Sequence, residues 1–195
     1  MTKVTISRLF DDYADAQSAV RQLRDAGVVD DDISVIANNA DKWYAPDYVA
    51  GAGKGAAIGA GFGGFGGLLA GLGLLAIPGL GPVVAAGWFA AAATGAAVAG
   101  AAGGAIGMLA EAGVAVNEAE VYAESIRRGG SLVSAKVEAH EKDRFEAILN
   151  PSSVDIASRR DELTETGWQG FDPKAPDPTA DEISRYRGKR GTGPA

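Results

Sequence analysis

The sequence predicts an α+β fold: a small ferredoxin-like β-α-β sandwich, interrupted by a long Gly/Ala-rich helical hairpin (a glycine zipper) and followed by a flexible C-terminal tail. Segments of strand-like and helix-like periodicity flank a stretch without Asp, Glu, Lys, Arg or His between Lys54 and Glu111, and turn-forming residues accumulate after Ser158. The expected division is residues 1–40 and 114–157 for the two halves of the α+β domain, 41–50 for a linker, 51–113 for the hairpin and 158–195 for a polar, mostly disordered tail.

The first half of the α+β domain is expected to contain a strand, a helix and a strand. Residues 4–10 alternate partially between apolar and polar and predict the first strand. Apolar residues then recur at spacings of three and four within 13–26, which predicts a helix that ends at Gly27. Residues 33–36 predict the second strand. The three aspartates at 30–32 lack the spacing and terminal glutamate of a calcium loop, which favours a solvated turn.

The uncharged stretch contains two rows of small residues four positions apart, which predict close contacts between helices. Its central turn, residues 77–82, is expected at Pro78, Gly79, Gly81 and Pro82, because proline lacks a backbone donor and glycine tolerates positive φ. The glycines expected to mediate oligomerisation are Gly51, Gly55, Gly59, Gly63, Gly67, Gly71, Gly87, Gly95, Gly103 and Gly107.

A helix this rich in glycine is unstable alone, because each interior glycine costs about 1 kcal/mol relative to alanine. In lipid, small residues four apart let two backbones approach closely. An apolar stripe, Ile58 to Leu72, lies away from the glycine row, and each arm of roughly 25 to 30 residues would be about 40 Å long, enough to cross a bilayer. Three alternatives remain: a membrane hairpin, a hairpin buried in a soluble oligomer, and a hairpin lying in the membrane interface.

The second half is expected to contain a helix, a strand, a helix and a strand. Asn117 is expected to cap a helix that runs to Arg128, where two glycines end it. Residues 131–137 alternate and predict the third strand, and residues 140–149 predict a helix. Val154 and Ile156 predict a fourth strand.

The tail begins with a plausible short helix at 159–166 and then becomes rich in glycine, proline and aspartate. Three aromatic residues stand in this polar context, namely Trp168, Phe171 and Tyr186. They are either anchors that dock on the domain of the same chain or a motif that binds an unknown protein partner.

Several segments together resemble the bacterial general stress protein family, that is, the heat-induced stress protein (YflT-type) domain in its glycine-zipper, low-temperature-induced form. The resemblance covers about residues 3 to 157. Its motifs are Arg8 to Asp12, Ala16 to Gly27, Asp32 to Ala37, Ala119 to Tyr122 and Arg128 to Val133. The resemblance implies induction by stress and no established catalytic activity.

The sequence contains no convincing catalytic or cofactor-binding site, so neither an enzyme nor a cofactor is expected. The only histidine, His140, is expected to be exposed at a helix start, and no cysteine is present. Residues 59–64 satisfy G-x-G-x-x-G, but no strand closely precedes them and no acidic residue follows within the uncharged run, so dinucleotide binding is not expected. No metal site is expected, and a net charge of -7 disfavours nucleic acid.

The expected function is that of a non-enzymatic, membrane-associated stress protein that forms homo-oligomers through its glycine rows. Its partners would be itself and the lipid bilayer, with the α+β domain in the cytoplasm, because residues 1–12 lack a secretory signal pattern. The alternative is a soluble, self-assembling cytoplasmic protein whose hairpins fill the core of an oligomer. A small-ligand sensor is a third possibility, with no pocket residues identified.

Overall fold

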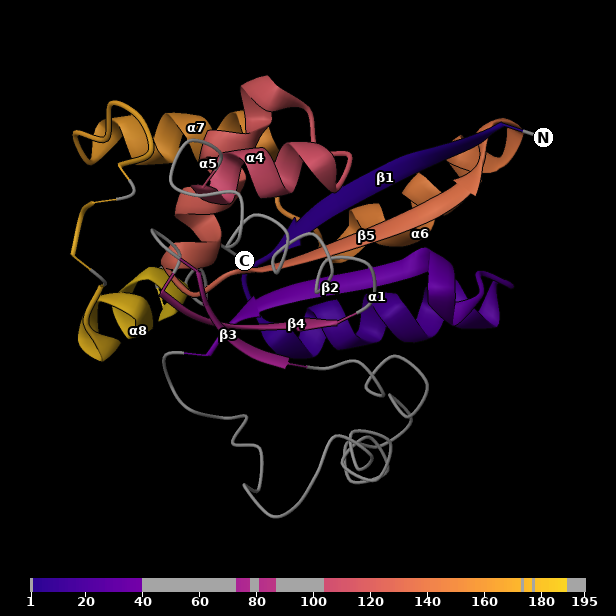
Figure 1. Ribbon diagram of the computed structural model, residues 1–195, viewed down its shortest axis with the longest axis horizontal. Coiled ribbons are helices and arrows are strands. Elements are labelled where there is room, and N and C mark those ends of the chain that lie inside the picture. Colours follow the sequence, from indigo (N-terminus) through magenta and orange to yellow (C-terminus); the bar gives the residue numbers. More distant parts are fainter. Residues whose placement is uncertain are drawn as a thin grey trace, which may run out of the picture.

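The fold is built around one antiparallel sheet whose strand order is β1-β5-β2-β4-β3 (Figure 1). The computed structural model describes residues 2–39, 73–77, 81–86, 104–172, 174–176 and 178–188. The strands are β1 (Lys3–Phe10), β2 (Ile33–Asn38), β3 (Gly73–Ile77), β4 (Gly81–Ala86) and β5 (Ser131–Glu138). Because β5 pairs with β1 on one side and with β2 on the other, it joins the two strands that come earliest in the chain.

One face of the sheet is covered by α1 (Tyr13–Asp25) and α6 (Lys142–Leu149). The even-numbered residues of β1, such as Ile6 and Phe10, point to this face, as the two-residue period of a strand requires. They pack with the apolar stripe of α1, which the spacing of three and four produces. The buried residues of α1 are Ala16, Ala19, Val20 and Leu23.

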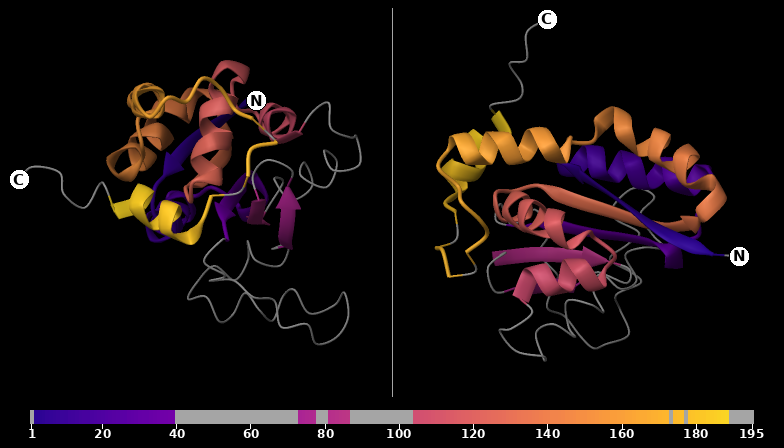
Figure 2. Two further views of the ribbon diagram at one scale, coloured as in Figure 1. Left: turned by 90° about the vertical axis from the view of Figure 1, so that its left-hand side faces the viewer. Right: turned by 90° about the horizontal axis from the view of Figure 1, so that it is seen from above.

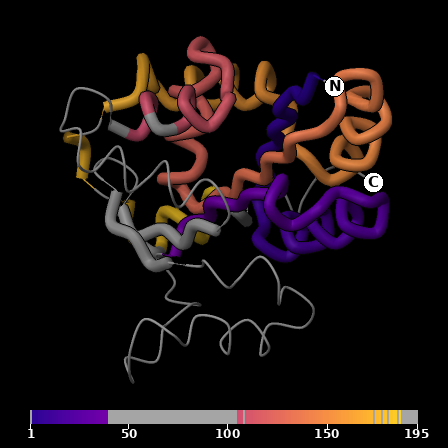
Figure 3. Tube along the Cα trace, turned by 45° about the vertical axis from the view of Figure 1, so that its right-hand side comes forward, coloured from indigo at the N-terminus to yellow at the C-terminus, as the bar shows by residue number. Residues whose placement is uncertain are grey.

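The opposite face is covered by α4 (Gly104–Glu111) and α5 (Val116–Arg127), which carry a second core (Figure 3). Leu9, Leu132 and Ile36 supply one row of this core across three neighbouring strands. Leu109 of α4 and Tyr122 of α5 are among the residues that pack on that row. The sheet is therefore buried on both faces where β1, β5 and β2 lie side by side.

The remaining described elements are 3₁₀ turns and two C-terminal helices. They are η1 (Asp30–Asp32), η4 (Ala139–Glu141), η5 (Asn150–Ser152), α7 (Ile156–Glu165) and α8 (Ala180–Gly188). Figure 2 shows α7 and α8 after α6 along the chain, with α8 at one end of the molecule. α7 is the short helix that the sequence predicts at 159–166, and it begins three residues earlier. α8 lies in the segment that was expected to be polar and mostly disordered.

The α+β class is confirmed, together with the helix at 13–25 and the strands at 3–10, 33–38 and 131–138. The predicted fourth strand is wrong. Val154 makes only an isolated bridge to Leu9, and Ile156 begins α7, because the Asp155 side chain caps that helix. The helix expected to be capped by Asn117 begins two residues earlier, with Ala115 in the N-cap position.

The helical hairpin expected around residues 77–82 is also corrected, because strands flank that turn. Residues 73–77 form β3 and residues 81–86 form β4, and the two pair antiparallel, with Ile77 opposite Gly81 and Ala76 opposite Pro82. β4 also pairs with β2, which makes this hairpin part of the sheet. The chain reverses where the proline and glycine pattern predicts, but the flanking residues are extended, because β4 pairs with β2 and β3 pairs with β4.

None of the helices in the described part of the chain has both the length and the apolar character that crossing a membrane requires. The longest described helix, α1, has 13 residues, against the roughly 20 that a span needs.

Candidate functional site

A cluster of charged side chains lies at the C-terminal end of α5. Glu124 has no exposed side-chain surface, yet it carries a carboxylate. Arg127 donates from Nη2 to Glu124 Oε2 at 2.7 Å, and Arg128 donates from Nε to Oε1 at 2.6 Å. Spacings of three and four place these side chains on one side of the helix. A buried carboxylate with two guanidinium partners is therefore the centre of the cluster.

The end of α5 is fixed to the sheet beneath it. Asn38, the last residue of β2, donates from Nδ2 to the carbonyl oxygens of Ile126 and Arg127, both at 3.0 Å. These carbonyls belong to the last turn of the helix, and the Ile126 carbonyl also accepts a hydrogen bond from the Gly129 amide at 3.0 Å. Gly129, with φ of 107°, then reverses the chain into β5. The cluster thus sits at a fixed position over β2 and β5.

Gly130 lets the chain pass close to the backbone of α5 and of β1. A Cβ at this position would lie 2.9 Å from the carbonyl oxygen of Ser125 and 3.3 Å from that of Phe10. The amide of Gly130 also donates to the Ser125 carbonyl at 2.9 Å. The two glycines before β5 are therefore required for different reasons, Gly129 by its dihedral angle and Gly130 by close approach.

A second buried charge, Arg159 of α7, extends the cluster toward the end of β1. Its side chain has no exposed surface, and it forms an ion pair with Asp11, which directly follows β1. Arg159 Nε also lies 3.5 Å from Glu162. One helical turn earlier, Asp155 accepts a hydrogen bond from the Ser158 amide at 2.8 Å, which holds the pKa of Asp155 below its ordinary value. This hydrogen bond caps the N-terminal end of α7 and stabilises its first turn.

The aromatic residues of the tail dock on the same chain. The Tyr186 ring of α8 lies beneath the guanidinium groups of Arg159, 4.7 Å from its centroid, and Arg128, 5.9 Å away. Both distances are within the range of cation–π attraction. Phe171 packs against the α4–α5 core. The backbone amide of Trp168 donates to the Leu163 carbonyl at 3.2 Å at the end of α7, and the indole Nε1 is buried. The side-chain contacts of Tyr186 and Phe171 agree with docking on the same chain.

A polar row crosses the middle of the sheet on the α5 face. The Ser7 and Ser134 hydroxyl groups are 2.7 Å apart on paired strands, and the Tyr122 hydroxyl donates to the Ser7 carbonyl at 3.5 Å. Burial raises the pKa of Tyr122 well above its ordinary value, and the nearby Glu118 carboxylate acts in the same direction. The row satisfies polar groups inside the core and offers no nucleophile with an adjacent base.

Chemically, the charged cluster is arranged to hold helices together. Its guanidinium groups point at carboxylates of the same chain, so its charges are largely compensated from within. Within the described ranges, no three His, Cys, Asp or Glu side chains gather in a way that could hold a metal ion. His140 is exposed in η4, where the sequence predicted a helix start.

Most glycines expected to mediate oligomerisation lie outside the described residues, as do Pro78 and Gly79. Gly107 is described and lies in α4, where an added Cβ would meet no atom within 4 Å. Gly81 and Pro82 are in β4.

The sequence analysis did not predict the charged cluster. Glu124, Arg127 and Arg128 nevertheless stand three and four positions apart, the spacing at which ion pairs form along a helix, and this spacing could have indicated it.

Residues 5–76 match the family model of the heat induced stress protein YflT domain. The match confirms the resemblance drawn from the sequence, over a shorter range than the 3–157 expected. It ends in β3 and stops before β4 and β5, so it contains no two strands that pair with each other. No curated protein and no solved structure gives a significant match to the chain.

Proposed function

We propose that this chain, which carries a YflT-type stress protein domain over residues 5–76, is a non-enzymatic general stress protein that binds membranes and forms homo-oligomers through its uncharged stretch. The domain match is the observation that supports the stress role. The uncharged stretch between Lys54 and Glu111 is the feature that supports membrane binding and self-association.

The sheet limits how that stretch can meet a membrane. β2, β4 and β3 are hydrogen-bonded neighbours, and α4 packs on α5, so residues 40–72 and 87–103 each leave one folded body and return to it. A segment that returns to the same body crosses a bilayer an even number of times. Two crossings need about 40 residues, and only about 18 uncharged residues precede β3. The proposal is therefore binding at the interface, without spanning.

The apolar stripe from Ile58 to Leu72 suits an interfacial position. Its members recur at spacings of four and three, and two of them, Phe62 and Phe65, are aromatic. In a helix, the glycines at every fourth position would occupy another face, where they would allow neighbouring copies to approach. In this proposal lipid covers the stripe, and the glycine rows lie between copies.

Flotation with lipid vesicles tests the membrane step. The full chain is mixed with vesicles that contain anionic lipid and is centrifuged through a sucrose gradient. We expect the protein to float with the vesicles, and the double variant Phe62→Ser, Phe65→Ser to stay at the bottom. The matched control is Val116→Ser, which removes an apolar side chain that is 69% exposed on α5 and should still float. Flotation of the double variant at the control level would contradict the proposal.

A second candidate is soluble self-assembly, which β3 favours. β3 is the last strand of the sheet, and among the described residues it pairs only with β4. Its sequence, GLLAI, has no charge and no proline, the devices that usually keep sheet edges from pairing with other copies. In this reading the β3 edges of two copies join, and the assembly forms without lipid.

Assembly size separates the two candidates. For the membrane protein, replacing Gly59, Gly63 and Gly67 by leucine should reduce oligomer size in detergent, while Leu75→Lys should leave it unchanged. For the soluble assembly, Leu75→Lys should produce monomers in light scattering without detergent. A large lipid-independent particle that fails to float would overturn the first candidate.

We further propose that β1, β5 and β2 form the centre of a ferredoxin-like arrangement. The support is that β5 lies between the two strands joined by α1, and that Val154 bridges to the free side of β1, where the fourth strand of that arrangement would lie. A solved structure that keeps β5 antiparallel between β1 and β2 would support it, whereas direct pairing of β1 with β2 would contradict it.

A further inference from the structure

Several contacts join the described residues of the C-terminal segment from Thr166 to Gly188 to the rest of the molecule. At its start, Trp168 donates its amide to Leu163, and near its middle the Pro176 carbonyl accepts a hydrogen bond from Arg127 Nη1 at 3.2 Å. At its end, Ile183 is 1% exposed and Tyr186 stacks on Arg159. No strand pairing holds the segment within its described residues, so side-chain contacts keep it in place.

Both polar aromatic residues of this segment are docked at a cost. Tyr186 Oη and Trp168 Nε1 are buried, and neither has a hydrogen-bond partner within the described part of the chain. In water each group would be hydrogen-bonded, so the docked position gives up hydration without replacing it. The rings and the buried Ile183 favour docking, while the polar atoms of Tyr186 and Trp168 oppose it.

The surface beneath the segment also favours release. Tyr186 covers the guanidinium group of Arg159, a charge with no exposed side-chain surface. Glu124 is equally buried at the adjacent end of α5. Ions inside a protein lose solvation, and partners on the same chain compensate this loss only in part. Lifting Tyr186 restores water to Arg159 without breaking its pairing with Asp11.

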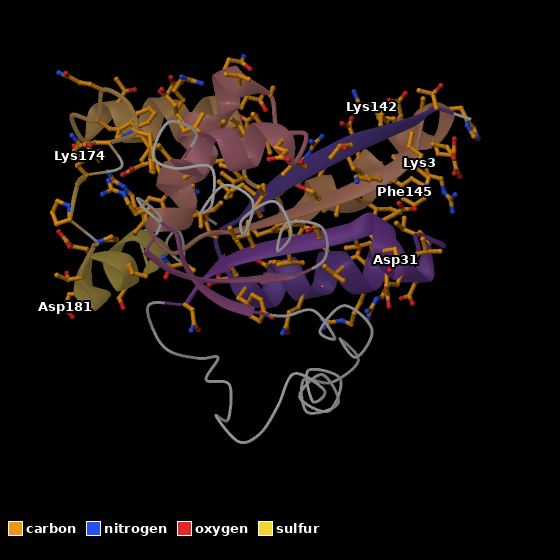
Figure 4. The ribbon with its side chains drawn as sticks, in the orientation of Figure 1. Lys3, Asp31, Lys142, Phe145, Lys174 and Asp181 are labelled. Carbon is orange, nitrogen blue, oxygen red and sulfur yellow. The ribbon has the colours of Figure 1, made fainter. Side chains whose placement is uncertain are left out.

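Two glycines at the base of the segment suit a hinge. Gly167 has φ of 87° and Gly170 has φ of 155°, both in regions that other residues rarely adopt. A Cβ at Gly167 would meet nothing within 4 Å, so this point is not clamped by packing. Beyond the glycines, Lys174 and Asp181 are exposed on the outer side of the segment (Figure 4).

We propose that the segment from Thr166 to Gly188 is a releasable latch. In the docked state it covers Arg128 and Arg159, and in the released state it exposes them together with the part of the α4–α5 core under Phe171. Docking orders some twenty residues, so its entropy cost grows with temperature and heating shifts the balance toward release. The latch therefore makes this face of the domain available in a temperature-dependent way.

Hydrogen exchange measured by mass spectrometry on the full chain tests the latch. Local release lets amides of α8 exchange while those of β5 stay protected, so the ratio of the two rates reports the opening equilibrium. The informative variant is Tyr186→Phe, which keeps the ring on Arg159 and removes only the unpaired hydroxyl. We expect α8 exchange to slow about tenfold, equivalent to ~1.4 kcal/mol. Tyr186→Ala, which removes the ring, should accelerate it by a similar factor.

The outcomes separate the latch from an ordinary docked helix. Unchanged or faster α8 exchange in Tyr186→Phe would overturn the proposal, as would α8 amides that exchange only as slowly as those of β5. Trypsin cleavage after Lys174 in the native protein supplies a second readout, which should accelerate with temperature well below the unfolding midpoint and slow in Tyr186→Phe. Cleavage that begins only at global unfolding would contradict release.

Discussion

Replacing Glu124 by glutamine tests how far the charged cluster stabilises the fold. The substitution keeps the shape of the side chain and removes its charge. In the native protein the carboxylate accepts hydrogen bonds from Arg127 and Arg128 at 2.6 to 3.0 Å. The amide of glutamine has only one oxygen, and its NH₂ group would face the two cationic groups.

The structure sets the magnitude of the effect. Removing one partner of a buried ion pair costs about 3–5 kcal/mol, because the other charge is left uncompensated. The Arg127 and Arg128 side chains are 12% and 28% exposed, so both recover some hydration and the lower end of that range applies. For a chain of this size, ~3 kcal/mol corresponds to a fall in Tm of roughly 6–12 °C.

Thermal unfolding followed by circular dichroism at pH 7 measures this change. The matched control is Glu162→Gln on α7, whose side chain is 50% exposed and 3.5 Å from Arg159. Because Glu162 is half exposed and Arg159 keeps its pairing with Asp11, the loss should be about 0–1 kcal/mol and the Tm should stay within roughly 4 °C of wild type. If Glu124→Gln unfolded at the temperature of this control, the buried carboxylate would not stabilise the end of α5 and the reasoning would be wrong.

Three further predictions concern packing and pH. Gly130→Ala should lower the free energy of unfolding by about 1–3 kcal/mol, because the added Cβ would meet the Ser125 carbonyl. Gly107→Ala should be neutral or stabilising, because a Cβ at this position in α4 meets no atom within 4 Å. Urea unfolding of both variants measures the difference. Hydrogen bonds from the Ser158 amide and hydroxyl hold the pKa of Asp155 below 3.8. The ionised Asp155 therefore stabilises the fold above that pH, and this contribution is lost as the pH falls through the lower pKa of the folded state. Asp155→Ala should remove this part of the acid dependence of the α7 signals in NMR spectra. Burial raises the pKa of Tyr122 above 10.0. The neutral Tyr122 therefore contributes fully to stability below pH 10, and this contribution declines as the pH rises toward the pKa of the folded state. Tyr122→Phe should raise the pH at which the protein unfolds in alkali, and an unchanged midpoint would contradict this.

The strands and helices of the two outer parts of the chain were predictable because their periodicity agrees with their burial. Residues 13–25 are an example, since the apolar spacing of three and four matches the four buried residues of α1. Val154 and Ile156 show the limit. Two β-branched residues suggested a strand, but Asp155 between them provides a helix cap, and a local hydrogen bond to Ser158 decides the outcome.

The strand β4 was not predictable because one of its partners is distant. The sequence predicts a helical hairpin that turns at 77–82, but β4 pairs with β2, more than forty positions earlier, and β3 pairs with β4. The charged cluster shows the same difficulty at the level of side chains. Local spacing could indicate contacts among Glu124, Arg127 and Arg128, but nothing near Arg159 in sequence announces Asp11 or Tyr186 as its neighbours.

The central place of β5 determines the order in which the chain can fold during synthesis. β1 and β2 have no hydrogen bonds to each other, because β5 lies between them, and β5 is completed only at Glu138. At about 5–20 residues per second, the ribosome needs roughly 5 to 20 s to make the hundred residues between β2 and the end of β5. The whole uncharged stretch emerges within this interval, before the sheet can close. The nascent chain therefore carries that stretch while β1 and β2 still lack β5, the strand that joins them.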